Sequence, residues 1–283
     1  MQPHPASHSN RPRTTATTTT TTTTTPFLSR AAFAYSACFC EENVYLMLES
    51  LLGQPCQASS EPPLEPPTAL ADHFDLFAVF ISNPTRSIPL WNHWDRSAKQ
   101  PRTVCWDYHV IGVGRPKCQS HGQTAADFRA TESIVLDLDT ALAFPISFTE
   151  YALHALRVDL QLDTQFQRSF RVIAAKDFLS YFSSDRRHMR KPSSTSSNKA
   201  SSDDARSTDA DTTHGRSWIM PPPSYPPICG PHARSEHDLE AFIDMYAGHS
   251  DRVPGIVVNQ EAFIDMFLNS GAGLGNEHWT THE

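Results

Sequence analysis

Cys40, His109 and Asp137 stand out first, because a thiol, an imidazole and a carboxylate can together attack an acyl carbon. In such a triad the cysteine is the nucleophile, the histidine accepts its proton, and the carboxylate orients the histidine. The three residues lie far apart in the sequence, so this chemistry depends on the elements that would bring them together.

Cys40 stands at the N-terminal edge of a predicted helix over residues 41–52. Free N–H groups and the helix dipole at that edge favour a thiolate, although the carboxylates of Glu41 and Glu42 oppose one. A buried, inert cysteine is the competing explanation, and Cys38, which precedes the helix, is the weaker nucleophile. The helix is indicated by apolar side chains at i, i+3, i+4 and i+7, namely Val44, Met47, Leu48 and Leu51.

His109 and Asp137 fall in two segments with the alternation of β-strands, residues 103–111 and 134–139. A polar connection that begins at Gly112 joins these segments, so they are most simply antiparallel neighbours in one sheet. With His109 directly opposite Asp137, their Cβ atoms would lie about 4.5–5.5 Å apart. The carboxylate could then hold one tautomer of the imidazole, which is the orienting role in a triad.

Each of these residues has an alternative role. A histidine inside a strand is often a hydrogen-bonded core residue, and this explanation stays open for His109. A carboxylate in an apolar strand is costly unless it is paired, so Asp137 needs a partner. Asp139 stands at the end of the same strand, where capping of a turn is expected. His188 is a competing base, less favoured because it adjoins a polar stretch.

Cysteine and histidine pairs also raise the question of a structural zinc site. Such sites usually contain two close pairs, with about two to four residues between the ligands of a pair. Cys118-x-x-His121 has that spacing, and it falls in a glycine-rich loop. We therefore expect no metal ion and no cofactor. The other pairs of potential ligands are Cys38 with Cys40 and Cys105 with His109.

Composition divides the 283-residue chain into one domain that carries the candidate triad and several stretches with little to bury. Segments dominated by Thr, Pro, Ser and charged residues cannot bury enough apolar surface to offset the entropy of ordering them. We expect a single catalytic domain over residues 33–270. The stretches expected to be disordered are a Thr-rich extension at 1–32, insertions at about 53–69 and 190–217, and a C-terminal tail at 271–283.

Charge and apolar pattern exclude several classes of partner. The net charge of -8 and the scattered Lys and Arg residues argue against nucleic-acid binding, and a solvated edge explains the basic group at 186–191. No run reaches the ~18 apolar residues that a membrane span requires, and no secretory signal is recognised. Six cysteines without such a signal indicate reduced thiols, so we expect a cytoplasmic location, with the nucleus as a second one.

The remaining pattern predicts a mixed α+β fold that contains the two candidate strands. Short apolar runs rich in aromatic and β-branched residues predict strands, and amphipathic stretches predict helices. Strands are expected at 74–82, 88–91, 170–173 and 255–258, and helices at 149–162, 176–182, 238–245 and 260–267.

Seven short sequence blocks follow one another in order from about residue 34 to 267. They are residues 38–43, 79–83, 106–110, 137–140, 170–173, 184–189 and 221–226. Together they resemble the protein N-terminal glutamine amidohydrolase family, and the string Trp106-Asp107-Tyr108-His109 is the most diagnostic block.

The resemblance implies a monomeric α-β-α sandwich around a mainly antiparallel sheet, similar to the papain and transglutaminase cores. It also implies a Cys-His-Asp triad, which Cys40, His109 and Asp137 match in this sequence. The implied activity converts an N-terminal Gln of proteins or peptides to Glu with release of ammonia. In the family this reaction feeds the arginylation branch of the N-degron pathway.

The expected mechanism is acyl transfer to water through a thioester on Cys40, with His109 as general base and acid. A carboxylate near the thiol would read the α-ammonium group of the substrate, and Glu41, Glu42 and Asp107 are the candidates. Two groups of alternatives stay open. The same triad could transfer the acyl group to an amine or cleave a peptide bond, or the chain could be a non-catalytic or zinc-stabilised binding module.

Overall fold

The computed structural model of the protein describes residues 28–53, 69–95, 98–117, 132–191, 218–246 and 253–268. Six of the described strands form one sheet in which every neighbouring pair is antiparallel. The order across this sheet is β10 (Ile256–Asn259), β7 (Ser169–Ala174), β1 (Phe74–Ser82), β4 (Tyr108–Pro116), β5 (Ile134–Leu136) and β6 (Ile146–Ser147). The other strands form two antiparallel ribbons, β2 (Ile88–Asp95) with β3 (Gln100–Trp106) and β8 (Ser183–Ser184) with β9 (Ile228–Cys229).

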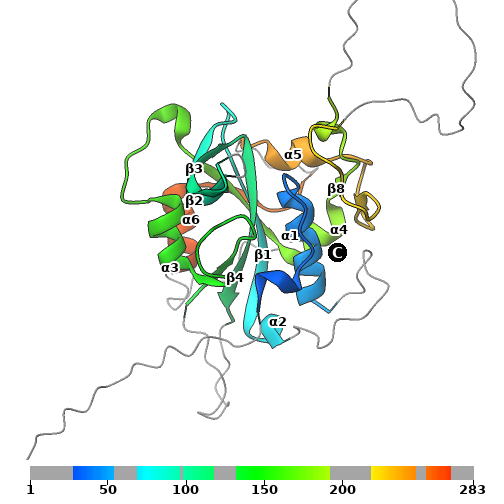
Figure 1. The fold of residues 1–283 in the computed structure, drawn as a ribbon. Helices are drawn as coiled ribbons and strands as arrows, with labels where there is room; N and C mark the ends of the chain where they lie inside the picture. The colour runs from blue at the N-terminus through cyan, green and yellow to red at the C-terminus, as the bar shows by residue number, and fades with distance from the viewer. Residues whose placement is uncertain are drawn as a thin grey trace, which may run out of the picture.

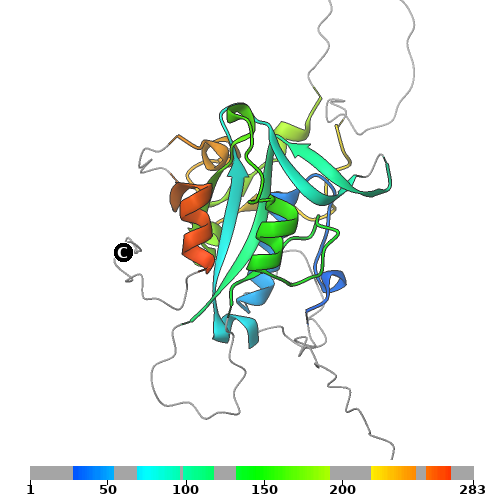
Figure 2. The same cartoon turned by 90° about the vertical axis from the view of Figure 1, so that its left-hand side faces the viewer.

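Helices cover both faces of the sheet, as Figures 1 and 2 show. One face carries α1 (Cys40–Leu51), α4 (Ala175–Tyr181) and α5 (Leu239–Ile243), and the other carries α3 (Phe148–Tyr151) and α6 (Gln260–Leu268). No helix in the described part of the chain is long and apolar enough to cross a bilayer. The remaining helical segments are α2 (Ala69–His73), the π-helical turn η2 (Ala152–Leu156) and the 3-10 turns η1 (Arg30–Ala32), η3 (Thr164–Phe166) and η4 (Arg187–Met189).

Strand β1 is almost entirely buried, and its side chains alternate between two apolar clusters. The cluster that includes α1, α4 and α5 receives Ala78 and Phe80, and the cluster that includes α3 and α6 receives Phe77, Val79 and Ile81. A strand covered on both faces needs apolar side chains in succession, which explains the sequence of β1. Each large side chain buried in this way contributes about 1.5–3 kcal/mol to stability.

Helix α1 packs directly on β4, and Gly112 permits the close approach. A Cβ atom on Gly112 would lie 2.9 Å from Cε of Met47 and 3.2 Å from Cβ of Leu136. These distances are shorter than ordinary van der Waals contacts, so a larger residue would force Met47 or the helix to move. The second half of α1 therefore lies close on β4, and the Tyr108 hydroxyl, which donates to Glu41, ties the start of the helix to the same strand.

The predicted α+β class with a mainly antiparallel sheet is confirmed, and β4 and β5 are antiparallel neighbours as expected. The single strand predicted at 103–111 is wrong, because β3 ends at Trp106 and β4 begins at Tyr108. The chain bends at Asp107, where the Ser82 hydroxyl donates to the backbone carbonyl at 2.8 Å. Strand β4 then continues to Pro116, so Gly112 lies inside the strand and not in the connection.

The helix predicted at 149–162 is also too long. Helix α3 and the turn η2 end at Leu156, and Arg157 has a left-handed backbone with a φ of 49° that stops the helix. The Thr-rich run, the greater part of both predicted insertions and the C-terminal tail lie outside the described residues. The division into one domain and disordered stretches therefore stays a prediction.

The two chain segments that flank residues 192–217 meet in space. Arg190 forms an isolated antiparallel bridge with Trp218, and its guanidinium carbon lies 5.3 Å from the centre of the Trp218 ring. The N–H of Ile219 donates to the carbonyl of Met189 at 2.8 Å. These contacts fix η4 beside the segment that leads to β9.

Candidate active site

Cys40 is the first residue of α1, and its thiol is buried. The backbone N–H of Val110 points at the sulfur, and Sγ lies 3.7 Å from Oε2 of Glu41. Burial, followed by the carboxylates of Glu41 and Asp139, raises the pKa of the thiol well above its ordinary value, although the Val110 N–H opposes this. Burial thus outweighs the preference for a thiolate expected at the helix start, and a base is needed to remove the proton.

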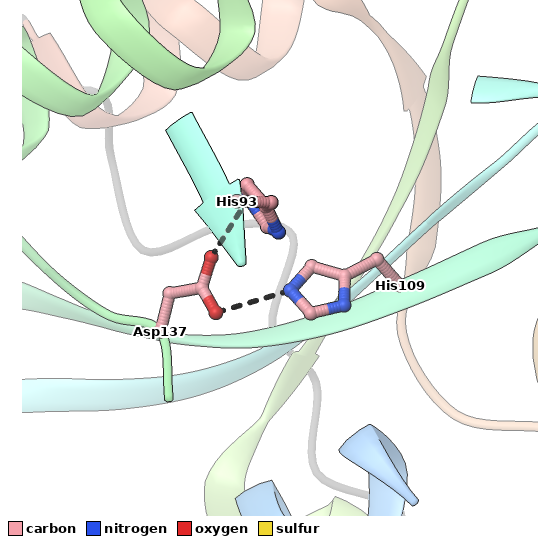
Figure 3. A group of neighbouring side chains, drawn as sticks. All are labelled: His93, His109 and Asp137. Carbon is pink, nitrogen blue, oxygen red and sulfur yellow. Dashed lines mark hydrogen bonds and ion pairs between the residues drawn. The ribbon is translucent and has the colours of Figure 1, made fainter. Parts of the chain in front are cut away.

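His109 and Asp137 lie against each other in the interior (Figure 3). Nε2 of His109 is 3.1 Å from Oδ1 of Asp137, and both side chains are fully buried. The carboxylate also accepts the hydroxyl of Tyr151 on Oδ2 at 2.7 Å and the N–H of Asp139 on Oδ1 at 2.9 Å. The structure therefore brings the predicted base and the predicted orienting carboxylate together.

The route by which these two residues meet differs from the predicted one. Strand β5 ends at Leu136, so Asp137 follows the strand and does not face His109 across a ladder of backbone hydrogen bonds. The Asp137 side chain accepts the N–H two residues further on and caps this turn, which is the role expected of Asp139. Asp139 instead accepts a hydrogen bond from the Tyr35 hydroxyl.

The contact between the two side chains controls their protonation. Burial alone would lower the pKa of His109, but the charge of Asp137 and its hydrogen bond raise it above 6.5. Burial alone would raise the pKa of Asp137, but His109, His93 and the Tyr151 hydroxyl hold it well below its ordinary value of 3.8. An ionised carboxylate thus lies beside a strengthened imidazole base.

One ring nitrogen of His109 is not engaged by Asp137. Its Nδ1 is buried and has no hydrogen-bond partner among the described residues. Cys40 forms no hydrogen bond to this nitrogen, but the residue after His109 is Val110, whose N–H points at the Cys40 sulfur. The charges of Glu41 and Asp139 act on both the thiol and the imidazole, so Cys40 lies in the same region as His109 and Asp137, but no hydrogen bond joins Cys40 to His109.

A second histidine, His93, which the sequence pattern did not reveal, contacts the same carboxylate (Figure 3). Its Nε2 is 3.3 Å from Oδ2 of Asp137, and its ring centre is 4.9 Å from that of His109. One signal was available, since His93 is flanked by aromatic residues as His109 is. The predicted edge strand stopped at Trp91, whereas β2 runs to Asp95, so this histidine fell outside every predicted element.

Two carboxylates in the first turn of α1 are buried beside the thiol and have different partners. Glu42 pairs with Arg186 at 2.8 Å. The prediction of a solvated basic edge is wrong for Arg186, which is buried because Glu42 needs a countercharge in the interior. Glu41 accepts the Tyr108 hydroxyl at 2.9 Å, and burial raises the pKa of Glu41 to about 8. Glu41 is therefore largely protonated at neutral pH.

The competing base, His188, lies beside Glu41. Its Nε2 is 3.5 Å from Oε1 of Glu41. Burial, together with the neighbouring His237, lowers the pKa of His188 to about 4, which makes it a weak base. Cys38, the weaker candidate for the nucleophile, lies in the turn before α1 with a left-handed φ of 66°.

The cysteine and histidine pairs considered for zinc are not gathered by the described part of the fold. Cys105 is exposed on β3, where its sulfur lies 3.1 Å from the Ser87 hydroxyl. Cys118 and His121 lie outside the described residues. Within the described ranges, the potential metal ligands whose atoms lie within 4.8 Å of one another are His93, His109 and Asp137.

A groove of about 790 Å³ lies between the N-terminal segment and the β2–β3 ribbon. Leu138, which separates Asp137 from Asp139, is one of its lining residues and connects it to the site. Its aromatic lining is partly exposed, with 40% of Tyr35 and 47% of Trp94 open to solvent. The groove therefore offers apolar surface next to the turn that carries Asp137.

Comparison with known proteins identifies the family. The N-terminal glutamine amidase family matches residues 35–267. A protein N-terminal glutamine amidohydrolase of Drosophila pseudoobscura pseudoobscura is 35% identical over 237 residues, which cover 84% of this chain and 89% of the relative. The protein of the same name from Drosophila melanogaster is 34% identical over the same length. These matches place the chain in a class of amide hydrolases. The chain belongs to the N-terminal glutamine amidase family, as its sequence blocks predicted.

Proposed function

We propose that the protein hydrolyses the side-chain amide of an N-terminal glutamine in peptides and proteins to give N-terminal glutamate and ammonia. Membership of the family and the names of the relatives support this activity. The structural observation that supports the proposal is the contact of His109 with Asp137 through Nε2, which leaves Nδ1 of His109 without a hydrogen bond, together with the charges of Glu41 and Asp139, which act on both His109 and Cys40. Cys40 is then the nucleophile, His109 the general base and acid, and Asp137 the orienting carboxylate.

In the proposed reaction, Nδ1 of His109 takes the proton of the Cys40 thiol as the sulfur attacks the side-chain carbonyl carbon. The backbone N–H of Cys40, at the start of α1, would stabilise the oxyanion. His109 returns the proton to the leaving nitrogen, the C–N bond breaks, and ammonia departs from a thioester on Cys40. Water then attacks the thioester and gives its proton to His109, and collapse of this intermediate releases glutamate and restores the thiol.

The proposal is tested by ammonia release from three peptides that differ only in where the amide stands. One begins with Gln, one begins with Asn, and one carries Gln at an internal position. We expect ammonia and the deamidated product from the Gln-initiated peptide alone. Equal release from the internal Gln would contradict the proposal. A length series of Gln-initiated peptides would measure in addition whether the groove contacts the following residues.

Two other reactions of a similar site are separated by adding a competing primary amine. Hydrolysis yields the free acid, whereas acyl transfer yields the substituted amide, and peptide cleavage yields two fragments. The mass of the product therefore distinguishes the three. Predominant substituted amide at a modest amine concentration would favour acyl transfer over the proposed hydrolysis.

An enzyme that acts only on a first residue must recognise the α-ammonium group, and we assign this role to Asp107. Glu42 is already paired with Arg186, and Glu41 is fully buried and largely protonated. Asp107 is exposed, yet it lies close enough to Cys40 to raise the pKa of the thiol. Its backbone carbonyl accepts the Ser82 hydroxyl and its side chain accepts the Tyr108 N–H, so the position of the carboxylate is fixed.

Replacing Asp107 with asparagine should raise KM for a Gln-initiated peptide about 10- to 100-fold, the loss expected for a hydrogen bond to a charged group. The variant should also discriminate less between a free and an acetylated N-terminus, because the amide no longer attracts an ammonium. Steady-state kinetics on both peptides measure these effects. Asp159→Asn is the control, since Asp159 is an exposed carboxylate paired with Arg157. An unchanged preference for the free amine in Asp107→Asn would refute the assignment.

We also infer how the reaction connects to its surroundings. The helix–sheet–helix layers, with a nucleophile at a helix start and a base on a central strand, support kinship with the papain and transglutaminase cores. The N-terminal glutamate produced would be the substrate for arginylation, which supports a place in that branch of the N-degron pathway. A monomer in the cytoplasm and nucleus stays the expectation.

A further inference from the structure

His93 is a buried polar side chain without a conventional hydrogen bond. It lies on β2 and is fully buried. Neither ring nitrogen has a hydrogen-bond partner of good geometry among the described residues, and Oδ2 of Asp137 lies 3.3 Å from Nε2. A buried polar group in this state costs stability, so an apolar side chain of similar size would be preferred if packing were the sole requirement.

The ring of His93 also limits the position of His109. The two imidazoles meet edge to face, with ring centres 4.9 Å apart and an interplanar angle of 82°. The ring of Trp106 stacks on His109, with ring centres 5.0 Å apart and an interplanar angle of 28°. The ring centres of Trp106 and His93 are 5.9 Å apart. The rings of His93 and Trp106 therefore bound His109. His93 also contacts Asp137, the carboxylate partner of His109.

We propose that His93 is a positioning residue that donates its Nε2–H to Asp137 and so holds the carboxylate, and through it His109, in the reactive orientation. This inference rests on the proposed function, in which His109 is the base. Burial is the main reason that the pKa of His93 falls to about 4, with Asp137 opposing and His109 adding to the shift. His93 is consequently neutral at the pH of the reaction, and it neither neutralises Asp137 nor competes as a cation.

The surroundings of His93 favour this role over a metal site. His109 on β4, Asp137 after β5 and Tyr151 on α3 are the titratable groups that meet at this point. Three of the potential ligands could approach a cation. However, the oxygens of Asp137 already accept hydrogen bonds from His109, the Asp139 N–H and the Tyr151 hydroxyl. A donor on His93 completes that set, whereas a cation would have to displace it.

The test compares His93→Phe, which keeps the ring but removes both nitrogens, with His93→Gln, whose amide can donate from a position near Nε2. We expect kcat to fall about 10- to 100-fold in His93→Phe with KM nearly unchanged, and to recover largely in His93→Gln. Loss of one donor makes Asp137 a stronger acceptor for His109, which raises the pKa of His109. The acidic limb of the pH profile of kcat/KM should therefore move to higher pH in His93→Phe alone. His154→Phe, at an exposed position on η2, controls for the loss of a histidine.

A second readout does not depend on turnover. The pKa of His109 is measured by NMR titration of the imidazole nitrogens, and it should rise in His93→Phe and return toward the wild-type value in His93→Gln. If the wild type were inactive but the pKa of His109 still rose in His93→Phe, the proposed function would be contradicted while the effect of His93 on His109 would stand. Unchanged kcat, pH profile and His109 pKa in His93→Phe would overturn the positioning role. So would stoichiometric bound zinc in the purified protein whose removal by a chelator abolishes activity.

Discussion

Cys40→Ala is expected to release no measurable ammonia from a Gln-initiated peptide, a loss of about 10⁴-fold or more in kcat. The sulfur is the atom that forms the thioester in the proposed reaction, and alanine offers no atom that could replace it. The thiol lies at the start of α1 against the Val110 N–H, where the backbone of alanine is tolerated without strain. The measurement is a coupled ammonia assay, accompanied by an unfolding curve to show that the variant is folded.

The matched control for this prediction is Cys38→Ala. Cys38 is two residues earlier in the turn before the helix, and it is the alternative nucleophile that the sequence leaves open. This variant should keep most of its activity, because the proposed reaction does not use its sulfur. Activity retained in Cys40→Ala and lost in Cys38→Ala would reverse the assignment. A trapped acyl-enzyme should likewise show the added mass on the peptide that contains Cys40.

Asp137→Asn is expected to lower kcat/KM about 10³- to 10⁴-fold. Every group around the carboxylate presents a donor to it, including the imidazole of His109, the hydroxyl of Tyr151 and the Asp139 N–H. The NH2 group of asparagine would face at least one of these donors, so His109 would lose its preferred tautomer and the carboxylate charge that raises its pKa. Kinetics with the Gln-initiated peptide measure the loss.

The same substitution should change stability and its dependence on pH. Removal of one partner from a buried, charged network costs about 3–5 kcal/mol, which urea unfolding at neutral pH can detect. The pKa of Asp137 is depressed in the folded state, so its stabilisation is complete well above its ordinary value of 3.8 and is lost as the pH falls below that value. The wild type should therefore lose stability more steeply than Asp137→Asn between about pH 5 and pH 2.

Asp139→Asn tests whether the loss in Asp137→Asn comes from the Asp137 carboxylate itself or from the removal of any negative charge nearby. Asp139 lies two residues further on, and it accepts the Tyr35 hydroxyl and does not contact His109 by a hydrogen bond. A decrease of less than about tenfold is expected, since the substitution keeps the Asp139 N–H that Asp137 accepts and removes a charge that acts on Cys40 and His109. If Asp139→Asn were the inactive variant and Asp137→Asn the active one, the orienting role would belong to Asp139.

The local sequence was enough to predict those helices and strands whose apolar pattern follows directly from the faces they bury. Helix α1 shows a regular apolar face, and β1 is a run of apolar residues because both of its sides are covered. The break at Asp107 could not be predicted, since alternation continues through it and the bend depends on a hydroxyl from β1. A contact with a residue of another strand does not change the local alternation of apolar and polar residues, so it cannot be predicted from that alternation.

The candidate site was predictable to a similar extent and for similar reasons. His109 and Asp137 were visible because polar residues stand out inside apolar strands. His93 was hidden because β2 has a register irregularity between Leu90 and His93, which interrupts its alternation. The burial of Arg186 could not be foreseen either, since its partner, Glu42, lies far away in the sequence. The charge of Arg186 alone predicted an exposed position, whereas its ion pair with Glu42 holds it in the interior.

The bridge between Arg190 and Trp218 links η4 to a distant part of the chain. Arg190 and Trp218 pair as residues of neighbouring strands do, and the Ile219 N–H donates to the Met189 carbonyl, so η4 is tied at its C-terminal end. Arg186, directly before η4, pairs with the buried Glu42 in the first turn of α1. A substitution at Trp218 is therefore expected to disturb the start of α1 through η4 and this ion pair, although Trp218 itself lies far from Glu42 in the sequence.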